Sequence, residues 1–401
     1  MKHAWRWILG GVILLPVLIV AGAALSNVGL PDHSQIVERL SEVEKARLAE
    51  MSHLRGALGD AVWPRWGEAE IPVIVYNEAY AFLVGYDGTP PDGWTMVPRN
   101  ERRGGPWQVV PDDVFQGQPY YRQPLTDPEQ TPENFAVLVG DRWAATLQTS
   151  EYSRVAFYGG FREELPTFLR PIVPVRLLWR LLMGDTETYI GVLAHEAFHA
   201  YQGTVAPGRL AAAEFAAPLE SRYPWENEAT EQAWQAELDV LYAAVTAAPD
   251  DEAAQYARQF LALREERRRS GALSAEMVDY ERQREWLEGL AKYAELVIQQ
   301  EAGRSTDYAP LPAIGDDPAF HAYHTRERFW SQQLAEVRRM TNRSGETRFY
   351  YSGMAQGVLL DRFTPGWKAE AWSEDVWLED LLAEAVQQAA PYTSNHGQTK
   401  L

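Results

Sequence analysis

Residues 188–202 form a continuous helical pattern that is apolar on nearly every side, and its middle carries the run His195-Glu196-Ala197-Phe198-His199. A helix that is apolar all round is expected to be buried. Two unpaired imidazoles and a carboxylate are costly in a buried position. The chain must therefore fold so that something compensates these three polar groups inside its core.

The spacing of the two histidines points to a metal ion as that compensation. Because His195 and His199 are four residues apart, both imidazoles lie on one helix face and can bind the same ion. Glu196 projects beside them, where it can reach a water molecule at the ion. With eight histidines in the chain, the motif is expected by chance in about one to two per cent of shuffled sequences. The alternative is a buried helix whose histidines hydrogen-bond to the backbone.

A catalytic zinc ion needs a third protein ligand and one open position, and two glutamates are candidates for that ligand. The helical neighbours of Glu237 on its own face are all apolar, so its carboxylate is expected to point into a core that must compensate it. Glu288 has Arg284 and Lys292 one turn before and after it, which is the pattern of a surface ion-pair ladder. The residues alone favour Glu237 as the third ligand. If Glu237 is not a ligand, it could orient a ligating histidine through a hydrogen bond.

Two further motifs carry a resemblance to a known family. The segment Glu288-Gly289-Leu290-Ala291-Lys292-Tyr293 resembles the third-ligand helix of the gluzincin metallopeptidases, and Tyr350-Tyr351-Ser352-Gly353 resembles the Tyr-x-x-Gly helix start of their aminopeptidase-like members. The resemblance implies a zincin-like core that binds Zn²⁺, with Glu288 as the third ligand and Tyr350 as the residue that stabilises the oxyanion. Three motifs in the family's order favour Glu288 over Glu237.

The chain also departs from the family's pattern. The interval between His199 and Glu288 is longer than in gluzincins, so a helical insertion is expected from about residue 203 to 274. Lys292 stands where thermolysin-like members carry an aspartate, and the sequence has no Gly-x-Met-Glu-Asn strand of the aminopeptidases. Aminopeptidase specificity is therefore not predicted.

Strand-like and helix-like patterns follow one another along the chain. The predicted parts are a stalk or amphipathic helix at 27–68, a strand-rich part at 69–185, a helical zinc-binding part at 186–390 and a tail at 391–401. Strands followed by helices indicate an α+β architecture with a zincin-like core rather than a wound α/β sheet. The basic run 264–269 is interpreted as a solvated helix face. The apolar run 172–183 with its arginines is interpreted as a buried amphipathic helix rather than one that touches a membrane.

The N-terminus differs in composition from the rest of the chain. Residues 7–26 contain no charged side chain, while basic residues precede them and acidic residues follow. About 20 apolar residues can span a bilayer, and this charge order places the remainder outside the cytoplasm. Residues 1–26 are therefore predicted to be a transmembrane anchor, or a signal segment if the chain is cut near Ala21-Gly22-Ala23. The predicted location is membrane-anchored and extracytoplasmic, or secreted.

The net charge of −19 repels phosphate backbones and anionic lipid surfaces, so a nucleic-acid partner is excluded. The sequence predicts a zinc-dependent hydrolase, most simply a peptidase acting on a peptide or protein substrate outside the cytoplasm. His195, His199 and Glu288 would bind Zn²⁺. Glu196 would act as general base and Tyr350 would stabilise the oxyanion. The alternative is a non-catalytic zincin-like extracytoplasmic protein that uses the same core as a binding scaffold.

Overall fold

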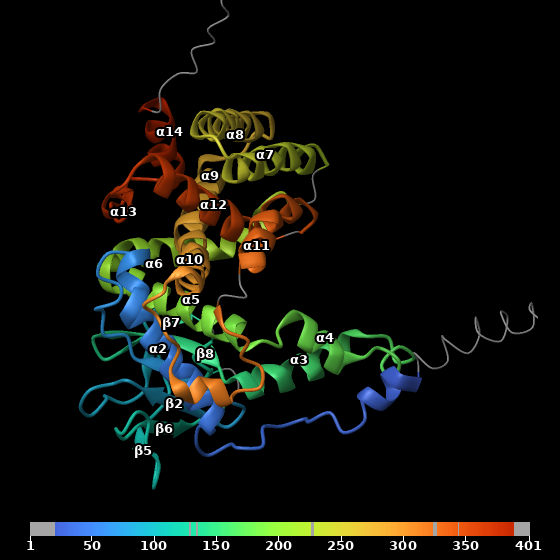
Figure 1. Ribbon diagram of the computed structural model, residues 1–401, viewed down its shortest axis with the longest axis vertical. Coiled ribbons are helices and arrows are strands. Elements are labelled where there is room, and N and C mark those ends of the chain that lie inside the picture. Colours follow the sequence, from blue (N-terminus) through green and yellow to red (C-terminus); the bar gives the residue numbers. More distant parts are fainter. Residues whose placement is uncertain are drawn as a thin grey trace, which may run out of the picture.

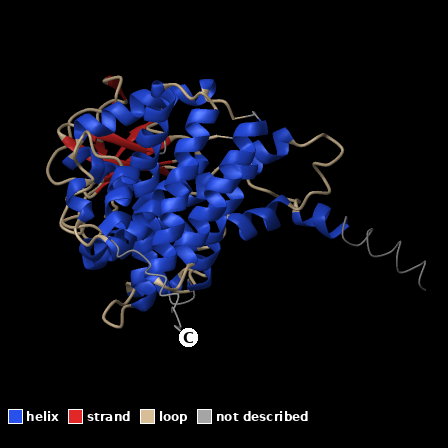
Figure 2. Cartoon of the chain, turned by 90° about the horizontal axis from the view of Figure 1, so that it is seen from above, coloured by secondary structure: helices blue, strands red, loops and turns tan. Residues whose placement is uncertain are grey.

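The computed structural model describes residues 21–388 apart from 128–129, 134, 226–227, 324–326 and 344. Its architecture is mixed α+β, which confirms the fold class that the order of the patterns predicts. The strands gather at one end of the molecule, and most of the later helices stack beyond them (Figures 1 and 2). The following helices and strands are those of the described residues.

The strands form one sheet in the order β4-β3-β7-β8-β1-β2-β6-β5. Their bounds are β1 (Val73–Tyr76), β2 (Tyr80–Val84), β3 (Trp94–Met96), β4 (Glu101–Arg103), β5 (Gln108–Val109), β6 (Tyr121–Pro124), β7 (Phe135–Val139) and β8 (Arg142–Gln148). β1 and β8 pair in parallel and the other pairs are antiparallel. The central strands are rich in β-branched and aromatic residues and are buried along almost their whole length, as expected for strands covered on both faces.

Helices precede and follow the sheet. The α-helices are α2 (Glu42–Val62), α3 (Ser150–Glu164), α4 (Val175–Leu182), α5 (Thr186–Val205), α6 (Pro207–Ala216), α7 (Glu228–Thr246), α8 (Asp250–Ser270), α9 (Ala275–Arg284), α10 (Leu290–Arg304), α11 (Glu327–Arg339), α12 (Thr347–Phe363), α13 (Trp367–Glu370) and α14 (Leu378–Gln388). Short 3₁₀ segments are η2 (Ala217–Arg222), η4 (Pro312–Asp316) and η6 (Met340–Asn342), and a π-helical turn, η3 (Glu285–Gly289), joins α9 to α10.

Helix α5 lies between the sheet and the helical part of the molecule. It packs against β7 and β8 on one side and against α2 and α10 on the other. Asp185 caps its N-terminus by accepting a hydrogen bond from the Thr188 backbone at 2.7 Å, as Asp commonly does at this position. Gly203 permits the close approach to the sheet, because a Cβ atom there would lie 2.3 Å from the ring of Trp143. Residues 193–203 are buried without exception, so the burial predicted for this apolar helix is confirmed.

The basic run 264–269 is a solvated face only in part, which corrects the interpretation of its charge pattern: Glu265, Glu266 and Arg269 are exposed, but two of its arginines are not. Arg264 and Arg267 are each 2% exposed and form ion pairs with buried carboxylates, Glu237 among them. Helix α8 packs against α7 and α14, and the partners come from neighbouring helices that the local sequence of α8 does not reveal.

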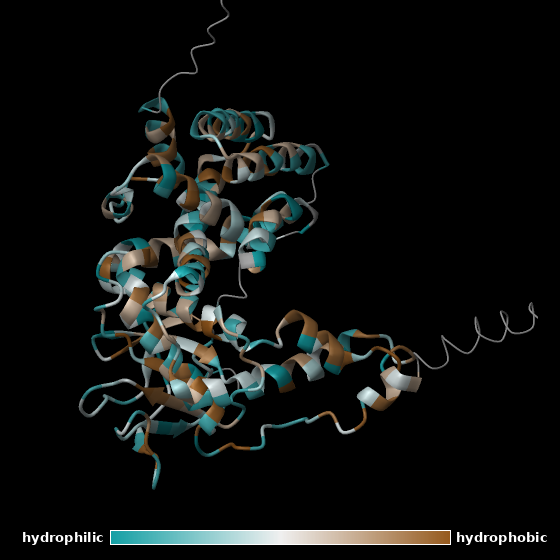
Figure 3. Cartoon of the chain, viewed as in Figure 1, coloured by the Kyte–Doolittle hydropathy of each residue, from teal (hydrophilic) through white to brown (hydrophobic). Residues whose placement is uncertain are grey.

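Helix α4 is also placed differently from the prediction. A buried amphipathic helix was expected in 172–183, but Val175 is the one buried residue of α4. Together with α3, this helix extends from the side of the molecule, and much of its surface is hydrophobic (Figure 3).

The predicted transmembrane anchor is corrected by the structure. Among the described residues, no helix combines the length and the apolar character needed to cross a membrane. The described end of the predicted segment is a short helix over residues 21–26, followed by a turn in which the Asn27 side chain donates to the Val173 carbonyl at 2.6 Å. Residues 7–20 of that segment lie outside the described residues. The membrane-anchored location that was predicted from this segment is therefore withdrawn.

Candidate metal centre

Two histidines of α5 point toward the helical part of the molecule. His195 and His199 lie one turn apart and are 6% and 1% exposed. Their Nε2 atoms are 3.1 Å apart, and the ring of Phe135 from β7 lies against His199 with a centroid separation of 4.9 Å. The four-residue spacing thus places both imidazoles on one buried face, as the sequence predicts.

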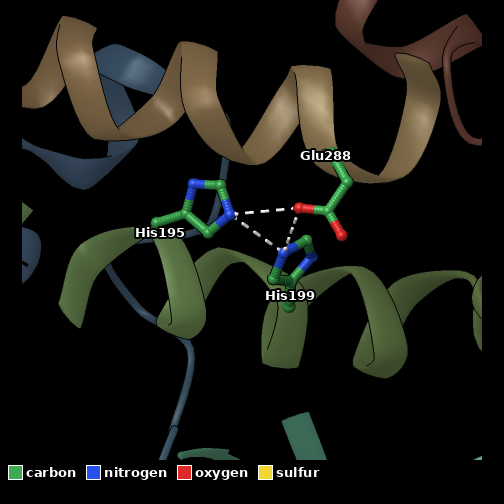
Figure 4. A group of neighbouring side chains, drawn as sticks. All are labelled: His195, His199 and Glu288. Atoms are coloured by element: carbon green, nitrogen blue, oxygen red, sulfur yellow. Dashed lines mark hydrogen bonds and ion pairs between the residues drawn. The ribbon is translucent and has the colours of Figure 1, made fainter. Parts of the chain in front are cut away.

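Glu288 completes a cluster with these two histidines (Figure 4). Its Oε2 atom is 3.3 Å from Nε2 of His195 and 3.3 Å from Nε2 of His199. Tetrahedral ligands about 2.0 to 2.2 Å from one zinc ion are separated from each other by about 3.3 to 3.6 Å. Two nitrogens and one carboxylate oxygen are ligand atoms that zinc binds. The two nitrogen–oxygen separations lie at the lower end of this range, and the nitrogen–nitrogen separation of 3.1 Å lies just below it.

A distortion of the helix places Glu288 at this point. Glu288 belongs to the π-helical turn η3 rather than to regular α-helix, and such turns occur often at functional sites. A Cβ atom on Gly353 of α12 would lie 2.8 Å from Cα of Gly289. The two glycines therefore let η3 and α12 touch through their backbones, which brings the glutamate motif and the Tyr-x-x-Gly motif to the same place.

The outer nitrogen of His195 makes a charge contact, and that of His199 makes a hydrogen bond. Nδ1 of His195 lies 3.3 Å from Oε2 of Glu295, and Nδ1 of His199 lies 2.8 Å from Oε1 of Gln202. The Gln202 amide then donates to the carbonyls of Trp286 and Leu287 at 3.0 and 3.1 Å. Partners of this kind fix the orientation of metal-binding imidazoles, and Gln202 ties the second histidine to the turn that carries Glu288.

The charges in the cluster compensate one another. Burial raises the pKa of Glu288, but His199 and Arg284 together hold it well below its ordinary value. Burial lowers the pKa of His195, whereas its contacts with Glu288 and Glu295 outweigh burial and raise it to about 10. A metal ion entering the cluster would therefore displace a proton.

Arg284 holds the other oxygen of Glu288, with Nη2 2.7 Å from Oε1. Arg284 and Glu288 are 3% and 4% exposed, so the surface ion-pair ladder inferred from this spacing is wrong. Lys292 does not complete such a ladder, because its ammonium group pairs with Glu295 at 2.6 Å. Arg284 also contacts Glu346, a half-buried residue just before α12, at 2.9 Å.

Glu196 is a buried carboxylate beside the cluster. It is 7% exposed, and its Oε2 atom has no hydrogen-bond partner among the described residues. Burial raises its pKa to about 8, with the nearby charges of Glu288 and Glu295 adding to the effect. A buried carboxylate oxygen without a hydrogen-bond partner is unusual in a folded protein.

Tyr350 lies beside the cluster on α12. Its ring stacks on His195 with centroids 5.8 Å apart and planes 11° apart. Burial and the hydrogen-bonded Glu288 hold its pKa well above the ordinary value, so the phenol keeps its proton. The structure thus brings Tyr350 together with His195, His199, Glu196 and Glu288, all five residues that the sequence analysis selected.

Glu237 lies outside this cluster. Its carboxylate is fully buried, as its apolar neighbours predict, but it accepts hydrogen bonds from Nε of Arg264 at 2.8 Å and Nε of Arg267 at 2.6 Å. Two arginines from α8 therefore compensate the charge that sequence reasoning assigned to a metal.

Sequence reasoning missed Glu295, Gln202 and Arg284 as parts of the site. Each had a local signal in helical spacings that share a face: Gln202 follows His199 by three residues, Glu295 follows Glu288 by seven, and Arg284 precedes Glu288 by four. A family search, a search of curated proteins and a search of solved structures find no match to this chain.

Proposed function

We propose that this protein is a zinc-dependent hydrolase, most simply a peptidase, with a zincin-like catalytic core. The observation that carries the proposal is the cluster of His195, His199 and Glu288, whose ligand atoms lie 3.1 to 3.3 Å apart. A buried carboxylate oxygen of Glu196 without a hydrogen-bond partner lies next to it in sequence. The gluzincin resemblance gains support from the meeting of its three motifs in space.

Each side chain has a task in this mechanism. A Zn²⁺ ion held by the two histidines and Glu288 would polarise a substrate carbonyl and acidify a water molecule. Glu196 accepts the proton of the attacking water and passes it to the leaving amine. Tyr350, which is protonated and next to His195, donates a hydrogen bond to the oxyanion as it forms. Glu295 and Gln202 hold the histidines in the required orientation.

Metal content, measured by mass spectrometry on the purified full chain, is the first test. We expect near-stoichiometric zinc in the wild type and its loss in Glu288→Gln. Glu237→Gln should retain zinc, because the Glu237 carboxylate binds Arg264 and Arg267. Glu265→Gln removes an exposed carboxylate and serves as the matched control. Zinc lost from Glu237→Gln but kept in Glu288→Gln would contradict the ligand set.

Hydrolysis is tested next on the zinc-loaded protein with a broad library of unstructured peptides. We expect cleavage that requires zinc and stops with a chelator. A fully zinc-loaded wild type that cleaves no peptide would overturn the peptidase proposal and favour the non-catalytic scaffold instead.

A further inference from the structure

The α4 protrusion, defined as residues 165–183, extends from the side of the molecule together with α3 (Figure 1). One side of it is held by aromatic contacts, since the Trp179 ring lies 5.4 Å from Phe157 and 6.5 Å from Tyr158. These contacts fix the direction of α4 and leave its opposite side without a partner among the described residues.

Several large apolar side chains of the protrusion are open to solvent. Phe168 is 73%, Leu181 72% and Leu182 62% exposed, and Leu177 and Met183 are about half exposed at 49% and 43%. Exposed large apolar side chains that are grouped on one segment are typical of interaction sites on folded proteins. The hydrophobic colour of α4 continues along the protrusion in Figure 3.

A segment near the N-terminus adds exposed apolar side chains beside the protrusion. The side-chain amide of Asn27 makes two hydrogen bonds to the protrusion. Its nitrogen donates to the Val173 carbonyl at 2.6 Å, and its oxygen accepts from the Val175 backbone N–H at 3.1 Å. Leu25 and Val28, next to this anchor, are 72% and 70% exposed. Two segments far apart in sequence therefore present large apolar side chains at the same end of the molecule.

The charge of the protrusion is opposite to that of the whole chain. Residues 165–183 contain Arg170, Arg176 and Arg180 but no acidic residue, whereas the complete chain has 56 acidic and 37 basic residues. None of the three arginines pairs with a carboxylate among the described residues; Arg170 and Arg176 donate to backbone carbonyls of Leu165 and Gly29 at 3.1 and 3.2 Å. The protrusion therefore carries a net positive charge, with Glu163 and Glu164 directly before it and Asp185 after it.

An amphipathic helix with exposed leucines and flanking arginines fits the interface of a lipid bilayer that contains anionic headgroups. The negative charge of the remaining chain opposes approach at long range, but salt screens charges beyond about 8 to 10 Å. We propose that the α4 protrusion binds the surface of an anionic lipid bilayer, with Phe168, Leu181 and Leu182 inserted among the headgroups and Arg176 and Arg180 contacting phosphate. No part of this interaction crosses the bilayer, and it is independent of the zinc site.

A single fluorescent label tests the insertion directly, because the chain has no cysteine. The full chain with Leu182→Cys, labelled with an environment-sensitive dye, is mixed with vesicles of phosphatidylcholine and phosphatidylglycerol. We expect a blue shift and a several-fold rise in emission, with a much smaller response to phosphatidylcholine alone. The control is Phe215→Cys on α6, which is 69% exposed and should not respond. A label at 182 that stays in water, or responds equally to neutral vesicles, overturns the proposal.

Vesicle flotation of the full chain tests the contribution of α4 to binding. Leu181→Glu combined with Leu182→Glu should lower the partition coefficient by about tenfold or more, because two apolar side chains are replaced by charges at the interface. Phe215→Glu should leave it unchanged. Unchanged flotation of the double variant would assign vesicle binding to another segment and overturn the proposal. A label at 182 that responds to protein concentration without vesicles would overturn it in favour of self-association.

Discussion

Glu196 is the residue on which the proposed chemistry depends most. It lies beside His195 in sequence, it is almost fully buried, and one of its oxygens has no partner among the described residues. Its amide counterpart has nearly the same volume but cannot accept a proton, so a substitution separates catalysis from structure.

Replacing Glu196 with glutamine should lower kcat by about 10²-fold to 10⁴-fold, the usual contribution of a positioned general base. Zinc content should stay at the wild-type level, because the three ligand atoms belong to other residues. Steady-state kinetics and metal analysis on the same preparation provide the measurement. Normal turnover in this variant would rule out the mechanism.

In the proposed site, Glu295 would orient a metal ligand rather than bind the metal ion itself. Its carboxylate contacts Nδ1 of His195 at 3.3 Å. Although burial raises its pKa, Lys292 and His195 lower it to about 2, so the group is charged at neutral pH. Glu295→Gln should weaken zinc binding by about 10-fold to 100-fold, the effect known for groups that orient a metal ligand.

Competition with a chelator measures the zinc affinity of Glu295→Gln. The control is Glu265→Gln, which removes an exposed carboxylate and should bind zinc as the wild type does. Equal zinc affinities in the two variants would show that Glu295 does not position His195.

At the scale of elements, the contact between η3 and α12 decides where Glu288 lies. A Cβ atom on Gly353 would come within 2.5 Å of the Glu285 carbonyl oxygen and 2.8 Å of Gly289 Cα. Backbone atoms cannot move aside cheaply, so Gly353→Ala should displace the π-helical turn. We expect a loss of about 1 to 3 kcal/mol of stability, as for other overpacked cores, and weaker zinc binding.

A glycine in α2 provides the matched control for this substitution. A Cβ atom on Gly56 meets nothing within 4 Å, so Gly56→Ala should be neutral or should stabilise by about 0.5 to 1 kcal/mol. Thermal unfolding and zinc titration of both variants make the comparison. A neutral Gly353→Ala would show that close backbone contact does not position Glu288.

The buried ion pairs between α7, α8, α9 and α14 make stability depend on pH. Burial raises the pKa of Glu281, but Arg267 and Arg268 lower it to about 2, below its ordinary value of 4.5. A depressed pKa in the folded state adds stability that is present above about pH 4.5 and is lost as the pH falls toward 2. Glu281 accounts for up to about 3 kcal/mol of this loss.

Urea unfolding at pH 5 and pH 3 tests this dependence. The wild type should lose more stability between the two pH values than Glu281→Gln, in which this group no longer titrates. Equal losses in the two proteins would show that the arginines do not hold the Glu281 carboxylate charged in the folded state.

At the scale of the whole molecule, the metal cluster links two parts of the chain. His195 and His199 come from α5, which packs on the sheet, and Glu288 comes from the helical part. A zinc ion bound there would therefore link these two parts, and only the folded state would provide the binding site. Binding to the folded state stabilises it by about 4 kcal/mol when the free ion is at 1,000 times its Kd.

Removing zinc with a chelator should therefore lower the melting temperature measured by calorimetry, and added Zn²⁺ should restore it. In Glu288→Gln the chelator should have little effect. An unchanged melting temperature in the wild type would argue against a structural contribution from the metal.

The sequence by itself determined the features that depend on local spacing. The i, i+4 spacing of two histidines in an apolar run is enough to place both on one buried helix face, and the succession of strand and helix patterns indicates the α+β class. Helical periodicity also placed Glu237 in the core. It did not show which groups would lie opposite that carboxylate.

Tertiary structure decided the questions that depend on distant neighbours. The local sequence around Arg264 and Arg267 is typical of exposed residues, yet packing against α7 and α14 buries both side chains. Both arginines bind the Glu237 carboxylate, whereas Glu288 contacts the two histidines. Helix α4 has the pattern of a buried helix, yet nothing in the described chain covers its outer side. A side chain's burial and partners are set by segments brought together from far along the chain, and local periodicity carries no information about them.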